Sequence, residues 1–283
     1  MIDLHTHTDA SDGSLSYAEL VAQARKAGLK AIAVTDHDNV ESAKKITGKE
    51  PLEVIPGVEL SVFDHALGYE DVHMLGLFID PKHKTLNSKL DTLLRQREAQ
   101  KRETIIILNR MGYDITFEEV RAIAKWGVGR PHIARLLVQK YPGEFHSVQE
   151  AFDKLLASGR PAYKLRQNGF TMQDAISLIH GAGGISVLAH PLIYPYDHEK
   201  LVADFARIGG KALETYYDYA TNAPRRGNEL GDIEGLHLKA LALAKAHGLR
   251  ESGGSDFHGE DKHQRLGAFG APDSLLEKLR ECR

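Results

Sequence analysis

The chain opens with the stretch IDLHTH, residues 2–7, and a second stretch, KAIAVTDHD, occupies residues 30–38. The first stretch is short and alternates between apolar and polar residues, as a strand does. The second begins with an almost continuous apolar run, which is typical of a strand buried in a parallel sheet. Between them, Ser16 and Glu19 have the spacing of a capping box, and the predicted helix ends at Gly28. These residues therefore predict a β-α-β unit.

The same alternation of strand and helix recurs along the rest of the chain. Helices are predicted from Thr171 to Gly184 and from Leu236 to His247. Strands that alternate with helices indicate an α/β protein, and we expect the strands to form a barrel. The further strand candidates are residues 54–55, 58–60, 72–77, 185–189, 212–217 and 251–255.

Residues 84–164 interrupt this alternation, because they contain helical patterns and no predicted strand. Within them, residues 99–164 carry 11 Lys and Arg against 7 Asp and Glu, a net charge of +4 in a chain whose total is −3. We therefore predict a barrel formed by residues 1–98 and 165–283, with a helical insertion, or cap, at 99–164. The contrast in charge favours an anionic substrate between them, although a solvated helical excursion would have the same composition.

The composition excludes several other classes of protein. The 283 residues are 42% hydrophobic and 27% charged, and the net charge of −3 gives no general signal for binding a polyanion. No apolar stretch reaches the roughly 20 residues of a membrane span, and no basic-then-apolar leader precedes Ile2. Cys282 is the single cysteine, which excludes an internal disulfide and a thiolate metal site. We expect a cytoplasmic protein without membrane association or a stable protein partner.

The 15 histidines are the unusual feature of the composition. His5 and His7 point to the same face of a strand, because strand side chains alternate. Other histidines and several carboxylates fall at or just past predicted strand ends, where parallel α/β barrels build their active sites. Independent surface histidines would have no reason to gather there. We therefore predict a multinuclear metal site made of nine residues, namely His5, His7, Asp12, His37, Glu59, His73, His190, Asp256 and His258.

The chemistry of these side chains limits the metal. Six imidazoles and three carboxylates, without a thiolate, suit Mn²⁺, Fe²⁺ or Zn²⁺. Nine ligands are too many for one ion, and we expect two or three ions. Three divalent ions would leave a charge of about +3 on the site. Such a site favours a phosphate dianion and generates hydroxide at neutral pH.

Seven of the nine predicted ligands stand in four short motifs. These are His5-Thr6-His7 with the Asp12 loop, Thr35-Asp36-His37-Asp38, His190-Pro191 and Ser255-Asp256-Phe257-His258. These motifs resemble those of the PHP (polymerase and histidinol phosphatase) family. The resemblance extends from end to end and is greatest to the stand-alone phosphoesterases that act on nucleoside 3',5'-bisphosphates and short oligoribonucleotides. It implies a distorted (β/α)7 TIM-like barrel, a trinuclear metal centre and phosphoester hydrolysis.

The resemblance also implies an assignment of the ligands. One ion would be held by His5, His7, Glu59 and Asp256. Glu59 would bridge to a second ion, which would also be held by His73 and His190. The third ion would be held by Asp12, His37 and His258. The chain departs from the subgroup at residues 39–42 and 192–194, where the leaving group is expected to bind.

Two arginines of the insertion resemble the phosphate-binding residues of the subgroup. Arg130 and Arg135 are expected to bind a non-scissile phosphate, because a guanidinium group matches phosphate geometry. Pro131 at the first helical position would place Arg130 in the preceding loop and Arg135 on the helix. Lys164 is a third candidate. Ordinary solvated side chains are the alternative interpretation of all three cations.

Candidates for proton transfer and base recognition are fewer. His132 and Asp38 are candidates for the catalytic acid. Asp36 and Asp38 are both expected to orient His37 or a metal-bound water rather than to bind a metal directly. Three tyrosines within residues 216–219 either stack on a nucleobase or pack in the core.

We therefore expect a metal-dependent phosphoesterase in which a metal-bound hydroxide attacks the phosphorus of a nucleotide or short oligonucleotide. One alternative is another small-molecule phosphatase, such as histidinol-phosphate phosphatase, which the basic insertion disfavours. A second is an amidohydrolase that cleaves C–N bonds, but such enzymes normally use a bridging lysine where this chain has Glu59. A non-catalytic metal-binding module is the third alternative, and the complete ligand set disfavours it.

Overall fold

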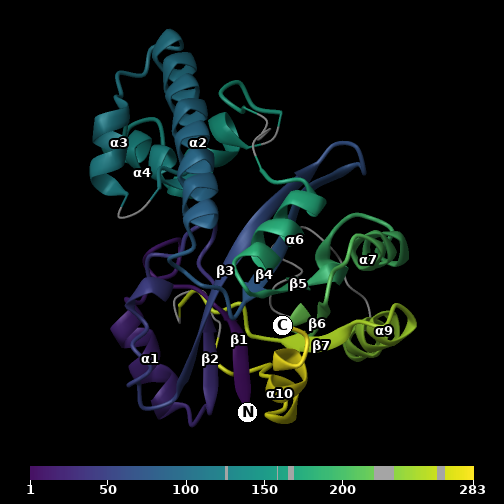
Figure 1. Cartoon of the computed structure of the whole chain (residues 1–283). Coiled ribbons are helices and arrows are strands. Elements are labelled where there is room, and N and C mark those ends of the chain that lie inside the picture. The colour runs from purple at the N-terminus through teal and green to yellow at the C-terminus, as the bar shows by residue number, and fades with distance from the viewer. Residues whose placement is uncertain (125–126, 158, 165–168, 220–232, 260–264) are drawn as a thin grey trace. The chain divides into compact units, whose positions relative to one another are not determined.

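The computed structural model describes residues 1–124, 127–157, 159–164, 169–219, 233–259 and 265–283 (Figure 1). Its strands are β1 (Ile2–Thr6), β2 (Ala31–Val34), β3 (Glu53–Asp64), β4 (Tyr69–Leu77), β5 (Ile185–Leu188), β6 (Ala212–Tyr216) and β7 (Arg250–Gly253). Its α-helices are α1 (Tyr17–Lys26), α2 (Lys84–Arg110), α3 (Phe117–Ile123), α4 (Arg130–Lys140), α5 (Val148–Ala151), α6 (Met172–Gly181), α7 (His198–Arg207), α9 (Ile233–Ala246) and α10 (Ser274–Arg280). Shorter helical turns are η1 (Ala43–Lys45), η2 (Phe152–Leu156) and η3 (Pro191–Ile193).

The chain forms two compact units. The first, the sheet unit, comprises Met1–Ser88 and Gly169–Arg283, and the second, the helical unit, is Lys89–Asn168. The predicted insertion at 99–164 lies inside the helical unit, which begins earlier, within α2. The predicted boundary between the insertion and the second part of the barrel, at residues 164 and 165, adjoins residues 165–168, which lie outside the described residues.

The strands of the sheet unit form one sheet whose spatial order is the order of the chain. β1, β2 and β3 are parallel, and so are β5, β6 and β7, whereas β4 runs antiparallel to both of its neighbours. The predicted α/β class is therefore confirmed, with one reversed strand. The reversal follows from the connection, because only residues 65–68 separate β3 from β4 and a parallel partner needs a crossover of about a dozen residues.

β3 is a single long strand where the sequence analysis predicted two short ones. Its residues Glu53 to Pro56 pair with β2, and the strand then continues beyond the end of β2 while it pairs with β4. Gly57 permits this continuation, because a Cβ atom there would lie 2.8 Å from Thr35 Cγ2 and 2.9 Å from the Gly76 carbonyl oxygen. β3 can therefore carry side chains well past the last residue of β2.

β2 is buried on both faces, which explains its unbroken apolar run. Ile32 and Val34 pack in a hydrophobic cluster with residues of α1. Ala31 and Ala33 belong to a second cluster, which also contains residues of β1, β3, β4, β5, β6 and α10. The period of two along the strand therefore divides its side chains between the two clusters.

The segment that follows β7 returns to β1. Thr6 forms a parallel bridge with Phe257, and the His7 N–H donates a hydrogen bond to the Phe257 carbonyl oxygen at 2.9 Å. The buried Asp3 carboxylate accepts hydrogen bonds from the Ser255 N–H (2.9 Å), the Ser255 hydroxyl (2.6 Å) and the Gly267 N–H (2.8 Å). These bonds attach the segment after β7 to the first strand.

The helical unit has a hydrophobic core of its own, formed by side chains of α2, α3, α4, α5 and η2. Thr116 and Glu119 form a capping box at the start of α3, since each side chain accepts a hydrogen bond from the backbone N–H of the other. Ser147 caps α5 by accepting from the Glu150 N–H at 3.1 Å. As predicted, the described part of residues 84–164 contains no strand.

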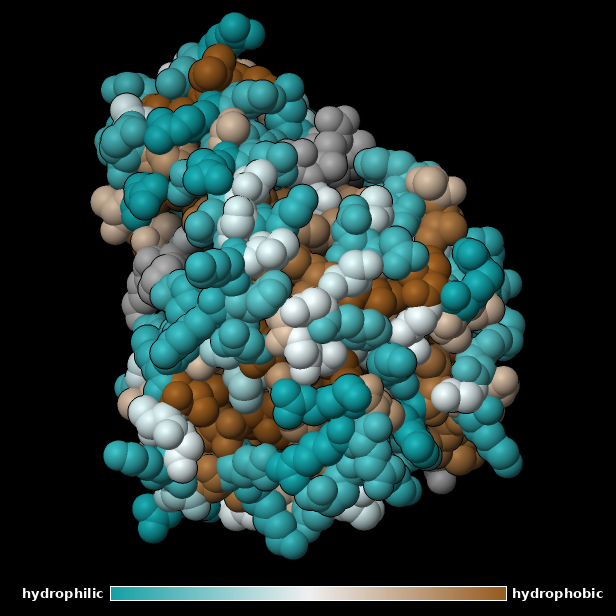
Figure 2. Space-filling model, in the orientation of Figure 1, coloured by the Kyte–Doolittle hydropathy of each residue, from teal (hydrophilic) through white to brown (hydrophobic). Residues whose placement is uncertain are grey.

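The surface carries mostly polar side chains. Hydrophilic residues cover most of the face drawn in Figure 2, with smaller hydrophobic areas between them. Among the described helices, none is both long enough and apolar enough to cross a membrane. Among the described residues, the exposed large apolar side chains are Met1, Leu94, Ile106, Met111, Leu238 and Phe269, of which Leu94 and Ile106 lie on α2.

Gly254 provides a test of the attachment between β1 and the segment after β7. A Cβ atom at this position would lie 2.4 Å from the His5 backbone nitrogen and 2.5 Å from His5 Cβ. Because a buried strand cannot move away freely, Gly254→Ala should lower the free energy of unfolding by about 1–3 kcal/mol. Urea denaturation followed by circular dichroism measures this change.

Gly181→Ala is the matched control. Gly181 is the last residue of α6, and no heavy atom lies within 4 Å of a Cβ placed there. The free energy of unfolding of this variant should stay the same or rise by up to about 1 kcal/mol. Equal effects of the two substitutions would show that close contact at Gly254 does not hold the two segments together.

Candidate metal centre

Two histidines at the end of β1 begin the site. His5 and His7 are fully buried, and their ring centroids lie 5.2 Å apart. Thr6 between them points elsewhere and donates its hydroxyl proton to the Ala33 carbonyl oxygen at 2.6 Å. The alternation of strand side chains thus produces this histidine pair.

Glu59 and His73 reach the site by a different route from the predicted one. Glu59 does not end a strand, because it lies in the middle of β3, where it forms a bridge with His37. His73 lies in the first half of β4 and pairs with Ser61 near the end of β3. The expectation that both residues stand at the ends of their strands is therefore wrong. The reversal of β4 nevertheless brings His73 to the edge of the sheet where the other ligands lie.

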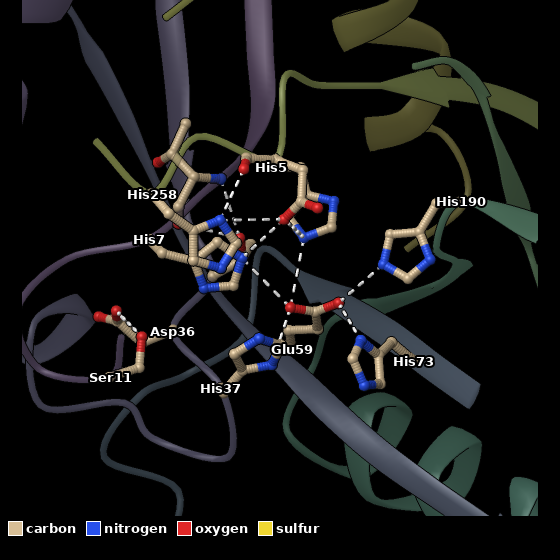
Figure 3. Close-up of polar contacts among 12 residues, drawn as sticks. His5, His7, Ser11, Asp36, His37, Glu59, His73, His190 and His258 are labelled. Carbon is tan, nitrogen blue, oxygen red and sulfur yellow. Dashed lines mark hydrogen bonds and ion pairs between the residues drawn. The ribbon is translucent and has the colours of Figure 1, made fainter. Parts of the chain in front are cut away.

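The Glu59 carboxylate is the centre of the site (Figure 3). It is fully buried, and its two oxygens face different imidazoles. Oε2 faces Nε2 of His5 (3.3 Å), Nε2 of His7 (3.2 Å) and Nδ1 of His37 (3.0 Å). Oε1 faces Nδ1 of His73 (2.9 Å) and Nε2 of His190 (3.3 Å). A carboxylate in such surroundings can bridge two cations.

Asp256 and Asp12 are the other two carboxylates of the cluster. Asp256 Oδ1 lies 3.3 Å from His5 Nε2 and 3.2 Å from His7 Nε2. Asp12 Oδ1 lies 3.2 Å from His258 Nε2 and 3.9 Å from a ring nitrogen of both His7 and His37. The structure therefore brings all nine residues of the predicted ligand set into one cluster.

Three groups within the cluster have ligand atoms close enough to hold an ion, with all atoms of a group within 4.8 Å of one another. The groups are His5, His7, Glu59 and Asp256; His7, Asp12, His37 and His258; and His37, Glu59 and His73. The first two contain the sets that the family resemblance implied for two of the ions. In the third, His37 stands with Glu59 and His73 where the resemblance implied His190.

The donor atoms fit a metal ion. Within the described residues, several buried atoms of the cluster make no hydrogen bond, namely Nε2 of His5, both ring nitrogens of His7, Oε2 of Glu59 and Nδ1 of His73. A buried polar atom without such a partner costs about 1–3 kcal/mol. Divalent cations that prefer nitrogen and oxygen ligands would satisfy these atoms together.

The carboxylates of the cluster also favour the protonated, positively charged form of the neighbouring imidazoles. Burial lowers the pKa of His7, but the carboxylates of Asp256 and Glu59 outweigh this effect and raise the pKa to about 10. Burial likewise lowers the pKa of His73, whereas the Glu59 and Asp71 carboxylates raise it to about 9. Burial raises the pKa of Glu59, but the surrounding imidazoles hold it well below its usual range. Divalent ions can take the place of the protons that these imidazoles would otherwise bind.

Glu214 is a buried carboxylate that the sequence analysis did not single out. Its Oε2 accepts a hydrogen bond from the His190 N–H at 2.7 Å, and its Oε1 lies 3.0 Å from His5 Nδ1. It therefore orients two of the predicted ligands from β6. A signal for it was present in the sequence, because a glutamate inside an otherwise uncharged strand is almost never fully buried without a partner.

The tyrosines after β6 have structural contacts that favour packing over base stacking. Tyr217 and Tyr219 are buried, with 4% and 1% of their surfaces exposed. The Tyr217 hydroxyl donates a hydrogen bond to Asp256 Oδ2 at 3.0 Å. Tyr217 therefore supports a predicted metal ligand.

Three residues of the site have left-handed backbone conformations. Their φ angles are 45° for Asp38, 31° for His190 and 54° for Asp256. Such conformations cost about 1–3 kcal/mol each in residues other than glycine and are concentrated at functional sites. The surrounding contacts must therefore hold these residues in place.

Asp36 and Asp38 hold the loops on either side of His37. The Asp36 carboxylate accepts hydrogen bonds from the Thr8 N–H and the Ser11 hydroxyl, each at 2.7 Å. The Asp38 carboxylate accepts from the N–H (2.9 Å) and the hydroxyl (2.8 Å) of Ser61. Both carboxylates therefore position the chain around His37.

The predicted substrate residues of the insertion lie in the helical unit. α4 begins at Arg130, so the expectation that Arg130 lies in the preceding loop is wrong, because Gly129 is the N-cap. The Arg130 guanidinium group donates to the Leu156 carbonyl oxygen at 3.2 Å and lies over the Tyr163 ring. Arg135 is exposed on α4. Lys164 Nζ lies 3.3 Å from a carboxylate oxygen of Glu103.

His132 has a capping role at the start of α4. Its Nδ1 accepts a hydrogen bond from the Gly129 N–H at 3.0 Å. Burial and the nearby Arg135 guanidinium lower the pKa of His132. The ring is therefore neutral at pH 7 and carries its proton on Nε2.

Comparison with known proteins gives one family. The PHP domain model matches residues 3–180. The chain is 33% identical over 262 residues to a 5'-3' exoribonuclease of Haemophilus influenzae, a match that covers 90% of this chain and 89% of that protein. It is 31% identical over 268 residues to a 3',5'-nucleoside bisphosphate phosphatase of Chromobacterium violaceum, with coverage of 91% and 87%.

The chain is also similar to a solved structure from Bifidobacterium adolescentis, which is described as a proposed metal-dependent phosphoesterase. The two structures superimpose with a TM-score of 0.79 and 27% sequence identity, and the match covers 99% of this chain and 96% of that chain. The fold and the cluster together place the protein among hydrolytic enzymes whose sites can bind metal ions. More narrowly, the chain belongs to the PHP-domain family, which confirms the resemblance of its motifs.

Glu59→Gln tests the bridging carboxylate. The amide keeps the shape of the side chain but removes the charge that the imidazoles surround. We expect the purified variant to bind fewer metal ions and its phosphoesterase turnover to fall by at least about 100-fold. Metal content is measured by plasma mass spectrometry after dialysis in Mn²⁺.

Glu53→Gln, in the same strand but on the surface beside Arg280, is the control for this substitution. Loss of one surface ion pair changes the free energy of unfolding by about 0–1 kcal/mol and should leave metal content unchanged. Undiminished metal and full activity in Glu59→Gln would mean that this carboxylate does not bridge the ions.

Proposed function

We propose that this protein hydrolyses phosphoesters of nucleotides, either a nucleoside 3',5'-bisphosphate or a short oligonucleotide, at a centre of two or three divalent metal ions. The observation that carries the proposal is the buried Glu59 carboxylate, whose two oxygens face different imidazoles. The names of two relatives that match most of the chain, an exoribonuclease and a nucleoside bisphosphate phosphatase, support the choice of substrate.

The ions would be Mn²⁺, Fe²⁺ or Zn²⁺, because the donor atoms are nitrogen and oxygen. When bound, they supply a Lewis acid for the phosphoryl oxygens and lower the pKa of a water molecule. The residues that would hold them are His5, His7, Asp12, His37, Glu59, His73, His190, Asp256 and His258.

Other residues of the chain would orient the ligands and move protons. Glu214 holds His5 and His190 in place through its two oxygens. Asp38 and His132 are the candidates for protonating the leaving group. Because Nδ1 of His132 accepts a backbone hydrogen bond, its Nε2 proton is the one available for transfer.

We further propose that residues 99–164 serve as a cap that selects the substrate. Arg130, Arg135 and Lys164 would bind a phosphate group that does not react. Arg135 is the strongest candidate, because it is exposed on α4, whereas Arg130 already contacts Leu156 and Lys164 contacts Glu103.

We also infer that the sheet closes into a distorted (β/α)7 barrel. Two observations support this closure. One is the cluster of apolar side chains to which β1 to β6 all contribute, and the other is the bridge between Thr6 and Phe257. In such a barrel the carboxyl-terminal ends of the parallel strands, near which His7, His37 and His190 lie, form the face used for catalysis.

A substrate panel tests the proposal against its alternatives. The metal-loaded protein is assayed on a nucleoside 3',5'-bisphosphate, a 5'-phosphorylated dinucleotide, histidinol phosphate and an amide substrate. We expect release of phosphate or nucleotide from the first two, and loss of turnover after treatment with a chelator. Preference for histidinol phosphate or for the amide would favour the corresponding alternative, and turnover that survives chelation would contradict the proposal.

Arg135→Ala tests the proposed role of the cap. Loss of one charge-assisted contact should cost about 1.5–3 kcal/mol, which lowers kcat/KM by roughly 10- to 100-fold for the bisphosphate. The change should be small for a nucleoside 3'-monophosphate, which lacks the second phosphate. Steady-state kinetics with the two substrates measure the difference.

Arg110→Ala is the control, because Arg110 is an exposed arginine at the end of α2 in the same unit. It should leave kcat/KM unchanged for both substrates. Equal losses on the mono- and bisphosphate in Arg135→Ala would show that Arg135 does not read the second phosphate.

A further inference from the structure

Tyr194 lies directly after η3 and contacts two of the predicted ligands with one oxygen. Its side chain is 4% exposed. The hydroxyl oxygen lies 2.8 Å from the His73 backbone nitrogen and 3.0 Å from His190 Nδ1. It therefore links β4, which carries His73, to the turn that carries His190.

The chemistry of this contact fixes the direction of one of its two hydrogen bonds. The His73 N–H can only donate, so the Tyr194 oxygen accepts from it. His190 turns Nε2 toward Glu59 and Nδ1 toward Tyr194. A neutral imidazole that binds an ion through Nε2 carries its proton on Nδ1, and the second lone pair of the Tyr194 oxygen can accept that proton's hydrogen bond.

The backbone at His190 has an unusual conformation that its contacts must hold. His190 has a left-handed φ of 31° and is followed by Pro191. Glu214 fixes the backbone N–H of His190 at 2.7 Å. The Tyr194 hydroxyl fixes the ring, so backbone and side chain are held by separate groups.

We propose that Tyr194 is a positioning residue that sets the spacing of His73 and His190 and holds His190 in the tautomer that binds an ion through Nε2. This inference rests on the proposed metal centre. The one hydroxyl contacts both His73 and His190, which lie on different segments of the chain, and can therefore fix their spacing. Removal of the hydroxyl should weaken the binding of the ion that Glu59, His73 and His190 would hold. The binding of the other ions should not change.

Tyr194→Phe and Tyr196→Phe form a matched pair. Tyr196 lies in the same loop and also reaches β4, where its hydroxyl accepts from the Glu70 N–H at 2.7 Å and donates to the Glu70 carbonyl oxygen at 3.0 Å. It touches none of the predicted ligands in these bonds. Tyr196→Phe therefore reports the effect of losing a hydroxyl that braces the same strand.

The first experiment measures ion binding without substrate, by competition with a chelator for Mn²⁺ and for Zn²⁺. In Tyr194→Phe, one class of ions should bind about 10- to 100-fold more weakly, as is typical when a group behind a ligand is removed. Tyr196→Phe should bind all ions like the unmodified protein. Unchanged affinity in Tyr194→Phe, or an equal loss in both variants, would overturn the proposal.

The second experiment observes the tautomer of His190 in the unmodified protein. In the Zn²⁺-loaded, ¹⁵N-histidine-labelled protein, the His190 ring should carry its proton on Nδ1, and Tyr194→Phe should shift that resonance. A proton on Nε2 in the Zn²⁺-loaded protein would overturn the proposal even if Tyr194→Phe did not fold. Because neither experiment uses a substrate, failure of the proposed phosphoesterase activity would be seen separately, in the substrate panel.

Discussion

A fully buried carboxylate surrounded by imidazoles, that of Glu59, is the interaction on which the rest of the structure depends. An isolated buried carboxylate costs several kcal/mol of desolvation, so the folded chain must surround it with groups that can bear positive charge. The five imidazoles near its oxygens come from the end of β1, the turn after β2, β4 and the turn after β5. The fold brings these segments of the chain together around Glu59.

The sheet meets that requirement by departing from regular strand geometry. β3 continues past β2 and carries Glu59 inward, and β4 reverses so that His73 arrives at the same edge. His190 and Asp256 have left-handed backbones, which Glu214 and the Asp3–Ser255 hydrogen bonds help to stabilise. Left-handed backbone and buried charge thus occur together at one edge of the sheet, where bound cations would offset the charge.

Much of the site could be predicted from the sequence, and the reason differs from one residue to the next. The pairing of His5 and His7 depends only on the period of a strand, which is local. The place of Glu59 within β3 and the direction of β4 depend on strand lengths and on the short connection at residues 65–68. Glu214 could not be assigned to His5, because 209 residues separate them and only the folded sheet makes them neighbours. α7 and α10 were not predicted, although α10 supplies part of the core of the sheet unit.

Anomalous diffraction from crystals grown with Mn²⁺ tests the central claim most directly, because it locates each ion independently of activity. The account predicts at least two ions, one beside each oxygen of Glu59, with ligand atoms of the histidines and carboxylates about 2.0–2.3 Å away. A single ion that does not touch Glu59, or ions bound only outside the cluster, would contradict it.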